Sequence, residues 1–267
     1  MSVVEPIEVA DRFRPTRSPL LWLCEREIVR YLKIWQYTIA GHAMSALLFV
    51  IVFGLALNGH IQGLDGTPYA RFILPGLLIQ AVVTVGFING TTTLYEARHD
   101  RYINDVLASP LRWWEFNLAL VVGSVTREIL TGGAVLAIAL PLTGGGIASP
   151  AVALGGLTAV LIASAQAGVI VGNYCKSVDQ IYSIEMLVVI PLGFLGGTFY
   201  AVSKLPAFWG TLTHFNPIFY FIEVMRAGLL GRADISSLAA LGASALIALL
   251  LTAWSLLVFR SGAQLKP

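Results

Sequence analysis

The sequence predicts an all-α integral membrane protein with six transmembrane helices, an amphipathic helix before them and a re-entrant helical hairpin between the fifth and sixth. Of its 267 residues, 57% are hydrophobic and 12% are charged, whereas a soluble domain carries roughly 25% charged residues. About 20 apolar helical residues cross the ~30 Å hydrocarbon core of a bilayer. Within 37–259, six apolar runs approach that length, at 37–57, 70–93, 117–141, 150–172, 182–199 and 236–259.

The N-terminal region divides into a tail and a helix. Residues 1–18 are polar and contain several arginines, so we expect a mobile cytosolic tail and no secretory signal. A helix is expected at 19–36, with Ser18 as its cap and Pro19 in its first turn. The pattern predicts an amphipathic helix in the membrane plane at the cytosolic interface, with a simple extension of the first span as the alternative. Its polar face holds Arg26, Glu27, Arg30 and Lys33, and its apolar face holds Leu20, Leu21, Cys24, Ile28, Tyr31, Leu32 and Trp35.

Between the second and third spans lies the longest charged segment that separates two spans, "YEARHDRYINDVLASPLRWWEF". We expect a short helix to about Leu107, a break, and a new helix capped by Ser109 with Pro110 at its first position. An ordinary solvated face is the alternative interpretation of its charges. The polar side chains Arg98, Asp100, Arg101, Asn104 and Asp105 would surround an apolar tip of Val106 and Leu107.

The stretch "FLGGTFYAVSKLPAFWGTLTHFNPIFYFIEVMR", between the fifth and sixth spans, is too apolar for a loop in water, and its pieces are too short to cross the membrane. Pro206 and Pro217 each favour the first turn of a helix, and Asn216 can cap the second. We therefore expect two short helices that enter the outer leaflet and return, with an external loop as the alternative. Aromatic residues would form an interfacial belt here: Phe208, Trp209, Phe215, Phe219 and Tyr220.

The distribution of positive charge predicts the orientation. Twelve of the 17 Lys and Arg residues lie on the side that holds both termini, four lie on the other side, and Arg127 lies within a span. Because positive residues concentrate on the cytosolic side, both termini are expected in the cytosol, including the tail 260–267. Cys24 and Cys175 then fall in cytosolic segments, where reduced thiols are expected.

Arg127 and Glu128 are adjacent charges well inside the third span. Ionisable groups in the hydrocarbon region are costly and are often functional. One of the two could pair with Glu185 or line a dimer axis, and a structural ion pair and a gating role are equal alternatives. Two GxxxG motifs, at 86–90 and 168–172, predict close helix packing, within the bundle or across a homodimer.

Several kinds of chemistry have no sequence support. The chain has no G-x-x-x-x-G-K-[ST] phosphate loop and no H-E-x-x-H motif, and its four histidines are scattered. We expect no catalytic residue, no metal site and no nucleic-acid partner. If the chain takes part in an ATP-driven process, ATP must be hydrolysed on another subunit.

The interfacial helix, the six spans, "YEARHDRYINDVLASPL", "KSVDQI" and the block from Pro191 to Gly231 together resemble the permease subunits of type-2 ABC exporters. That family includes drug-efflux permeases and permeases for polysaccharides and nodulation lipo-oligosaccharides. The resemblance implies a transmembrane domain at 37–259, a coupling helix at 95–110 that docks on an ATPase, a connecting helix at 19–36, and external re-entrant helices at 200–228 that cap the exit. The implied coupling residues are Glu96, Arg98, Asp100, Arg101, Asn104, Asp105 and Leu107; the implied external gate is Phe199, Tyr200, Pro206, Phe208, Trp209, Asn216, Pro217, Glu223 and Arg226.

The same resemblance implies two permease copies, as a homodimer, with two ABC ATPase subunits in a bacterial inner membrane. ATP and Mg²⁺ would bind the ATPase, and this chain would carry no cofactor. Its Phe- and Leu-rich pathway suits a hydrophobic or amphipathic cargo, such as a drug, a lipid or a lipid-linked saccharide. The alternatives are an ion-coupled secondary transporter, which would need repeats and several midplane charges, and a lipid-modifying membrane enzyme, for which no convergent site is visible.

Overall fold

A computed structural model describes residues 18–33, 35–56 and 67–262, and every regular element in these ranges is helical. Five helical segments are long and apolar enough to cross a membrane: α4 (Tyr69–His99), α6 (Trp113–Thr143), α7 (Pro150–Tyr174), the segment Val178–Leu195, and α12 (Ser237–Ser261). The first expected span corresponds to a π-helical turn, Gln36–Ala40, and the shorter α3 (Gly41–Ala56). The count of six spans therefore stays a prediction.

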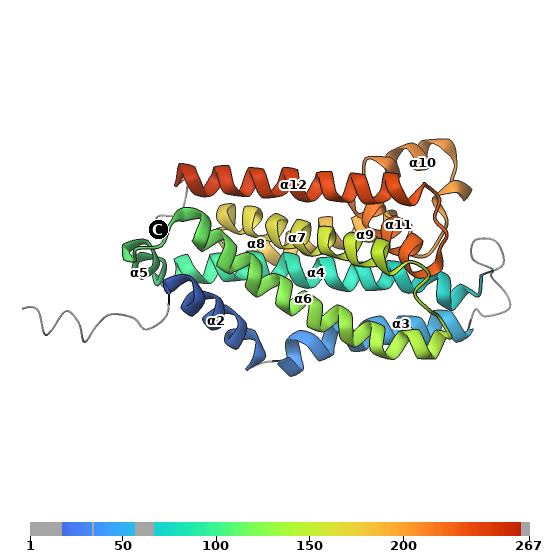
Figure 1. Ribbon diagram of the computed structural model, residues 1–267, viewed down its shortest axis with the longest axis horizontal. Helices are drawn as coiled ribbons and strands as arrows, with labels where there is room; N and C mark the ends of the chain where they lie inside the picture. The colour runs from blue at the N-terminus through green and yellow to red at the C-terminus, as the bar shows by residue number, and fades with distance from the viewer. Residues whose placement is uncertain (1–17, 34, 57–66, 263–267) are drawn as a thin grey trace, which may run out of the picture.

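The long helices lie side by side along one axis, and the short elements gather at the two ends (Figure 1). At one end are α2 (Pro19–Leu32), α5 (Ile103–Ala108) and the end of α12. At the other are α10 (Ala207–His214) and α11 (Pro217–Leu230). The charged segment and the aromatic segment thus lie at opposite ends of the bundle, as alternating crossings require.

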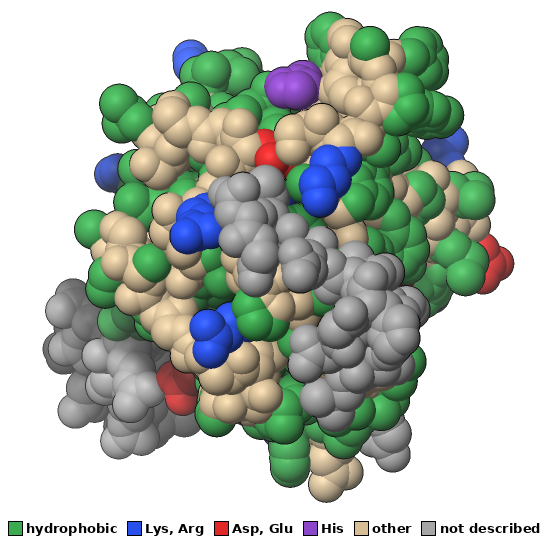
Figure 2. Space-filling view, turned by 90° about the vertical axis from the view of Figure 1, so that its right-hand side faces the viewer, with side chains coloured by type: hydrophobic (Ala, Val, Ile, Leu, Met, Phe, Trp, Pro, Cys, Tyr) green, Lys and Arg blue, Asp and Glu red, His purple; other side chains and the backbone are tan. Residues whose placement is uncertain are grey.

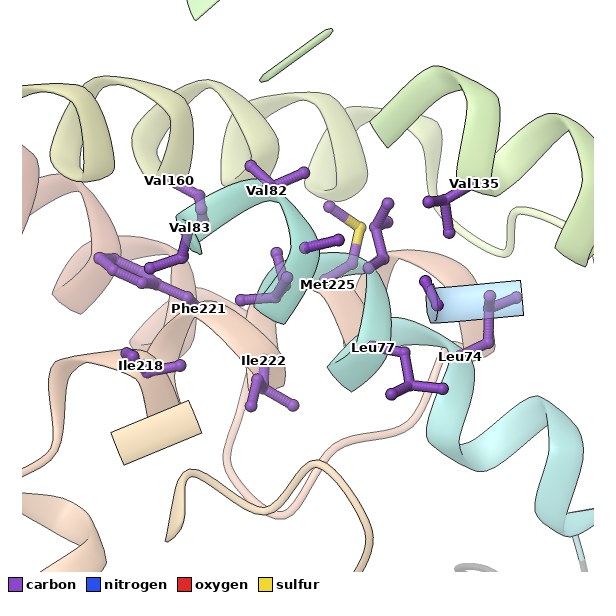
Figure 3. Packing of buried hydrophobic residues seen from close by; sticks show 14 of the residues in the cluster. Leu74, Leu77, Val82, Val83, Val135, Val160, Ile218, Phe221, Ile222 and Met225 are labelled. Atoms are coloured by element: carbon purple, nitrogen blue, oxygen red, sulfur yellow. The ribbon is translucent and has the colours of Figure 1, made fainter. Parts of the chain in front are cut away.

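Helix α4 occupies the centre of the bundle and is buried along most of its length. Its side chains meet those of α6, α7 and α11 in a continuous apolar core (Figure 3). The GxxxG motifs form the α4–α7 contact, because a Cβ built on Gly168 would lie 2.4 Å from the carbonyl oxygen of Phe87, and one on Gly90 would lie 2.8 Å from that of Ala165. These glycines therefore serve packing inside the bundle.

Helix α2 begins as predicted, with the Ser18 hydroxyl accepting from the backbone N–H of Leu21 and Pro19 in the first turn. It ends at Leu32, earlier than the predicted 36. The prediction for Glu27 is wrong: the residue, expected on the polar face, is buried against α6. Leu21, expected on the apolar face, lies on the protein surface, where an interfacial helix would contact lipid. The helix packs through its Leu23–Glu27–Tyr31 side because Gly123 of α6 leaves room for the Glu27 side chain.

The segment 95–116 also differs from the prediction. Residues 95–99 continue α4, so only Ile103–Ala108 forms a separate helix within 95–110. Ser109 ends α5 instead of capping the next helix, and α6 starts at Trp113. The N-terminus of α6 is capped by the carboxylate of Glu115, which accepts from the backbone N–H of Arg112 at 2.7 Å. The Glu115 carboxylate, bonded to the backbone N–H three residues after Ser109, therefore sets the start of α6 in preference to Ser109 and Pro110.

The aromatic segment contains the two short helices that its prolines predicted. The preceding span consists of α8 (Val178–Ile184), a π-helical turn (Glu185–Val189) and α9 (Ile190–Leu195), and a 3₁₀ turn (Val202–Lys204) leads to α10. Asn216 caps α11 as expected, accepting from the N–H of Ile218 at 3.0 Å, whereas Pro206 occupies the cap position of α10 and not its first turn. Of the predicted tails 1–18 and 260–267, residues 1–17 and 263–267 lie outside the described residues, and residues 260 and 261 belong to the end of α12.

Candidate functional site

At one end of the bundle, helix α2, helix α5 and the last turn of α4 pack together. We call this region the α2–α5 corner. A second apolar cluster supports it, with side chains from α2, α4, α5, α6, α7 and α12. In this cluster the Phe116 and Phe259 rings meet edge to face at 5.6 Å between centroids, and Leu23 and Ile103 are fully buried. The corner is therefore packed against the transmembrane helices and is not a loose loop.

Two cationic side chains of α2 join it to the rest of the corner. The guanidinium of Arg26 lies over the Tyr102 ring, 3.8 Å from its centroid. Arg30 donates to the Glu96 carboxylate and to the Thr93 hydroxyl, both on α4. The Tyr102 hydroxyl donates to the Thr93 carbonyl at 3.4 Å, and burial, followed by the nearby Glu27, raises the pKa of Tyr102 to about 12. Helix α2 is thus held to both α4 and the start of α5.

Glu27 lies between these two arginines but is only loosely paired. Its oxygens are 3.8 Å from Arg26 Nη1 and 3.4 Å from Arg30 Nη2, and neither oxygen accepts a hydrogen bond within the described part of the chain. Burial raises the pKa of Glu27 above its ordinary value, and the two arginines oppose that rise. A buried carboxylate with such weak partners is costly to the stability of the fold.

The predicted coupling residues separate into two groups. Arg98 turns away from the surface: its guanidinium donates to the carbonyl oxygens of Gly172, Asn173 and Cys175, at 2.5, 2.8 and 2.6 Å, and so caps the end of α7. The side chain of Leu107 lies outside the described residues. The others are exposed at the tip of the corner, namely Glu96, Asp100, Arg101, Asn104 and Asp105, and Lys33 of α2 is also exposed.

A groove of about 790 Å³ separates α2 from α5. Its lining is mostly apolar, with Trp22, Leu23 and Leu111 among its walls, and Arg26 and Asp105 at its edges. Arg101 adopts a left-handed backbone conformation (φ 60°), which turns the chain sharply from α4 into α5. The corner therefore presents a charged tip beside an apolar recess.

The two intramembrane charges, Arg127 and Glu128, form hydrogen bonds with residues other than the expected Glu185. Arg127 donates to Asn89 Oδ1 at 3.0 Å, and Asn89 donates to the Ser124 hydroxyl at 3.1 Å. Glu128 is fully buried and accepts from the Ser164 hydroxyl at 2.7 Å. The suggested pair with Glu185 does not form among the described residues. Groups on α4 and α7 thus contact both charges through an amide and a hydroxyl, while Arg127 Nε and Glu128 Oε1 have no hydrogen-bond partner among the described residues.

At the opposite end, Glu223 and Arg226 form a fully buried ion pair on α11. Arg226 also donates to the Gly197 carbonyl at 2.8 Å, and Glu223 accepts from the backbone N–H of Asp234 at 2.5 Å. Asp234 in turn accepts from the N–H of Val202 at 2.7 Å. These contacts hold the turn before α10 and the turn after α11 together, so the pair positions the hairpin.

The remaining residues of the predicted external gate divide by helix. Phe208 and Trp209 of α10 are exposed, while most of α11 is buried against α4 and α7. Phe199 accepts at its carbonyl from the Tyr69 hydroxyl at 3.0 Å, and the Tyr200 hydroxyl donates to the Leu195 carbonyl at 3.1 Å. Figure 2 looks onto this end, where Lys and Arg side chains are scattered among apolar ones. A recess of about 340 Å³ there is lined by Arg71 and Arg232.

The described residues contain no cluster of three His, Cys, Asp or Glu side chains able to hold a metal ion. Cys24 and Cys175 form no disulfide. Sequence reasoning missed four groups that organise these sites: Thr93, Tyr102, Ser164 and Asp234. Polar residues one turn apart on α4, Asn89 and Thr93, were a usable signal for a buried polar face, whereas the role of Asp234 depends on tertiary contacts alone.

These observations define a multi-pass, all-helical membrane protein with an anchored helical corner at one end. The chain belongs to the ABC-2 type transporter family, whose profile matches residues 19–230. Members of this family are membrane components of ABC transporters and work with an ABC ATPase partner.

Two curated relatives illustrate the range of similarity. "Inner membrane transport permease YadH" of Escherichia coli K12 is 33% identical over 237 residues, which covers 87% of this chain and 91% of that protein. "Nodulation protein J" of Sinorhizobium fredii is 23% identical over 218 residues, covering 80% of this chain and 83% of that protein. Both alignments span most of the chain, so the similarity concerns the whole transmembrane architecture.

Proposed function

We propose that this chain is the permease subunit of an ATP-driven exporter and that the tip of the α2–α5 corner docks on a separate ABC ATPase. The α2–α5 corner carries this proposal. Its exposed side chains lie beyond the end of the bundle: Asp100 and Arg101 in the turn that leads into α5, and Asn104 and Asp105 on α5, which is anchored to the spans. Family membership supports it, and favours ATP coupling over an ion-coupled secondary transporter.

The contacts around α5 suggest how force would reach the spans. A displacement of α5 moves Tyr102, which lies against Arg26 of α2. Helix α2 transmits it to α4 through Arg30 and Glu96, and to α6 through its packing beside Gly123. Since charge-assisted contacts are directional and short, the corner would move as one unit with the ends of α4 and α6.

Family membership and the charge distribution support a proposal for the assembly. We propose a homodimer of permeases with two ATPases, in a bacterial inner membrane with both termini cytosolic. The excess of Lys and Arg on the terminal side supports the orientation, and the name of the Escherichia coli relative supports the inner membrane. The cargo would be hydrophobic or amphipathic, as a drug, a lipid or a lipid-linked saccharide is. ATP and Mg²⁺ would bind the ATPase chains.

Cysteine cross-linking tests the docking face. In a chain with Cys24→Ser and Cys175→Ser, a single Asp105→Cys should cross-link to cysteines on the partner ATPase in membranes. Lys204→Cys, at the opposite end, is the matched control and should give no product. Absence of any Asp105→Cys product, together with full transport after neutralising Asp100, Arg101 and Asp105, would refute the proposal.

A further inference from the structure

A second groove lies at the same end of the bundle as α5, between α7, α8 and α12, with a volume of about 650 Å³. Its floor is apolar and includes Ile170, Val171 and Ile184. Tyr174, the last residue of α7, and Trp254, about two turns before the end of α12, form part of its wall. At 1.5 Å of rise per residue, the groove lies within roughly 10 Å of the helix ends. It therefore sits at the level of one membrane leaflet and its headgroups.

The groove is open on its aromatic side. Tyr174 is 46% exposed and Trp254 is 54% exposed, so both rings offer a surface to a bound molecule. Ile170 and Val171 at the floor provide van der Waals contact for an alkyl chain. Aromatic faces next to an apolar slot suit a molecule with a hydrocarbon part and a cationic head, because the ring quadrupole attracts positive charge.

The charge of the lining has one sign. Asp179 contributes an exposed carboxylate, and no Lys or Arg side chain lines the groove. Lys176 is exposed three residues before it and outside the lining, and Asp179 has no ion pair within residues 18–33, 35–56 and 67–262. Gln180 Oε1 is already engaged by the backbone N–H of Lys176 at 2.8 Å. The polar edge thus presents chiefly the carboxylate of Asp179 and the hydroxyl of Ser183.

As an acidic residue in the first turn of α8, Asp179 also complements the helix dipole. That role requires only its charge near the helix start and leaves the carboxylate available to the groove. We propose that this groove is a binding site for cationic amphiphiles, which enter from the leaflet on the α5 side. Asp179 would pair with the head, Trp254 and Tyr174 would flank it, and the tail would lie on the floor. As the loading site of an exporter, the assignment rests on the function proposed above.

Photolabelling of the full chain in lipid nanodiscs, without ATPase, tests the site. The probe is an alkyltrimethylammonium with a diazirine on its chain, and the matched probe is the corresponding alkyl sulfate. Peptide mass spectrometry should find the cationic probe on α7, α8 and α12 around the groove. Asp179→Asn should weaken its binding about fivefold, as expected for roughly 1 kcal/mol of partly exposed ion pairing. Glu25→Gln, at an exposed acid of α2 that lines neither groove, should leave labelling unchanged.

A second variant tests whether binding of the probe needs the open volume of the groove. Ser183→Trp fills the groove and should reduce labelling by the cationic probe, with the thermal unfolding midpoint confirming an intact fold. Equal labelling by the two probes, labelling elsewhere only, or labelling unaffected by Asp179→Asn would overturn the site. Because the assay contains no ATPase, its failure leaves the docking proposal intact, while a failed Asp105→Cys cross-link leaves the groove intact.

Discussion

The space that a side chain would fill at Gly86 is occupied by the carboxyl group of Glu128: a Cβ on Gly86 would lie 2.1 Å from Glu128 Oε1. Ser164 approaches the same point, 2.8 Å from that Cβ. A glycine on α4 thus allows an acidic side chain of α6 to lie between α4 and α7. The intramembrane carboxyl group is a packed component of the helix interface and does not face an open cavity.

Gly86→Ala is expected to destabilise the protein. The added methyl group must displace Glu128 or separate α4 from α6, and overpacking of this kind costs about 1–3 kcal/mol. The thermal unfolding midpoint in detergent should fall, whereas Gly133→Ala, whose Cβ meets nothing within 4 Å, should not lower it. Combining Gly86→Ala with Glu128→Ala should recover part of the loss; a full, additive loss in the double variant would contradict this packing.

Ser164→Ala removes the hydroxyl that is hydrogen-bonded to Glu128. A buried polar group that loses its partner costs about 1–3 kcal/mol, so this variant should unfold at a lower temperature. The control is Ser244→Ala, since the buried Ser244 hydroxyl has no hydrogen-bond partner among the described residues. Equal effects of the two variants would mean that the Ser164 bond contributes nothing.

Arg98→Ala should loosen the end of α7, because three carbonyl oxygens lose their donor. Hydrogen bonds from a charged group contribute about 1.5–3 kcal/mol to stability. Arg98→Lys should restore only part of the stability of the α7 end, because an ammonium group cannot span three acceptors as a guanidinium does. Hydrogen exchange at residues 170–175 measures the effect, with exposed Lys33→Ala as the control. Unchanged exchange in Arg98→Ala would show that the cap is dispensable.

Glu27 should contribute a pH dependence to stability. Burial raises its folded-state pKa above the ordinary value of 4.5, so between these two pKa values the folded state binds more protons than the unfolded state. The contribution of Glu27 to stability is therefore complete at pH values below 4.5 and is lost as the pH rises through the folded-state pKa. Unfolding midpoints across this range should fall more steeply with pH for the unmodified chain than for Glu27→Gln, and parallel profiles would contradict the burial of a titrating Glu27.

Arg226→Met leaves the Glu223 carboxylate buried without its cation. Breaking a buried ion pair in this way costs about 3–5 kcal/mol, so the turns around α10 should become sensitive to protease at lower temperature. Arg226→Met combined with Glu223→Leu should be less destabilised than the single variant. Lys204→Gln, on the exposed 3₁₀ turn, serves as the control and should resemble the unmodified chain. A single variant as stable as the control would exclude a positioning role.

The sequence predicted the features that depend on local chemistry. The Ser18 and Asn216 caps formed because each hydroxyl or amide oxygen meets a free N–H of its own first turn, and long apolar runs became long helices. The apolar periodicity of α2 placed Glu27 on the exposed face because it ranks residues by polarity alone. Gly123 on another helix creates the space for Glu27, so the buried face of α2 is decided by its neighbour.

The candidate site was predicted only in part for the same reason. Exposed residues of α5 follow from the charge of the segment, but Arg98 is drawn to the end of α7 by acceptors more than 70 residues away. The start of α6 was misplaced because two capping signals competed, and the Glu115 carboxylate offers a stronger acceptor than the Ser109 hydroxyl. Partners that meet only after folding leave no trace in a single sequence.

Helix α4 joins the two ends of the molecule in one continuous piece, from Tyr69, hydrogen-bonded beside the aromatic turn, to His99 at the corner. Pro75 removes one backbone hydrogen-bond donor near the Tyr69 end, and no further proline follows before His99. Under the proposed coupling, an axial shift applied at His99 would travel along this uninterrupted stretch to Pro75, about 36 Å away at 1.5 Å per residue. A helix break introduced midway along α4 would then interrupt the transmission of movement between the α2–α5 corner and the aromatic end.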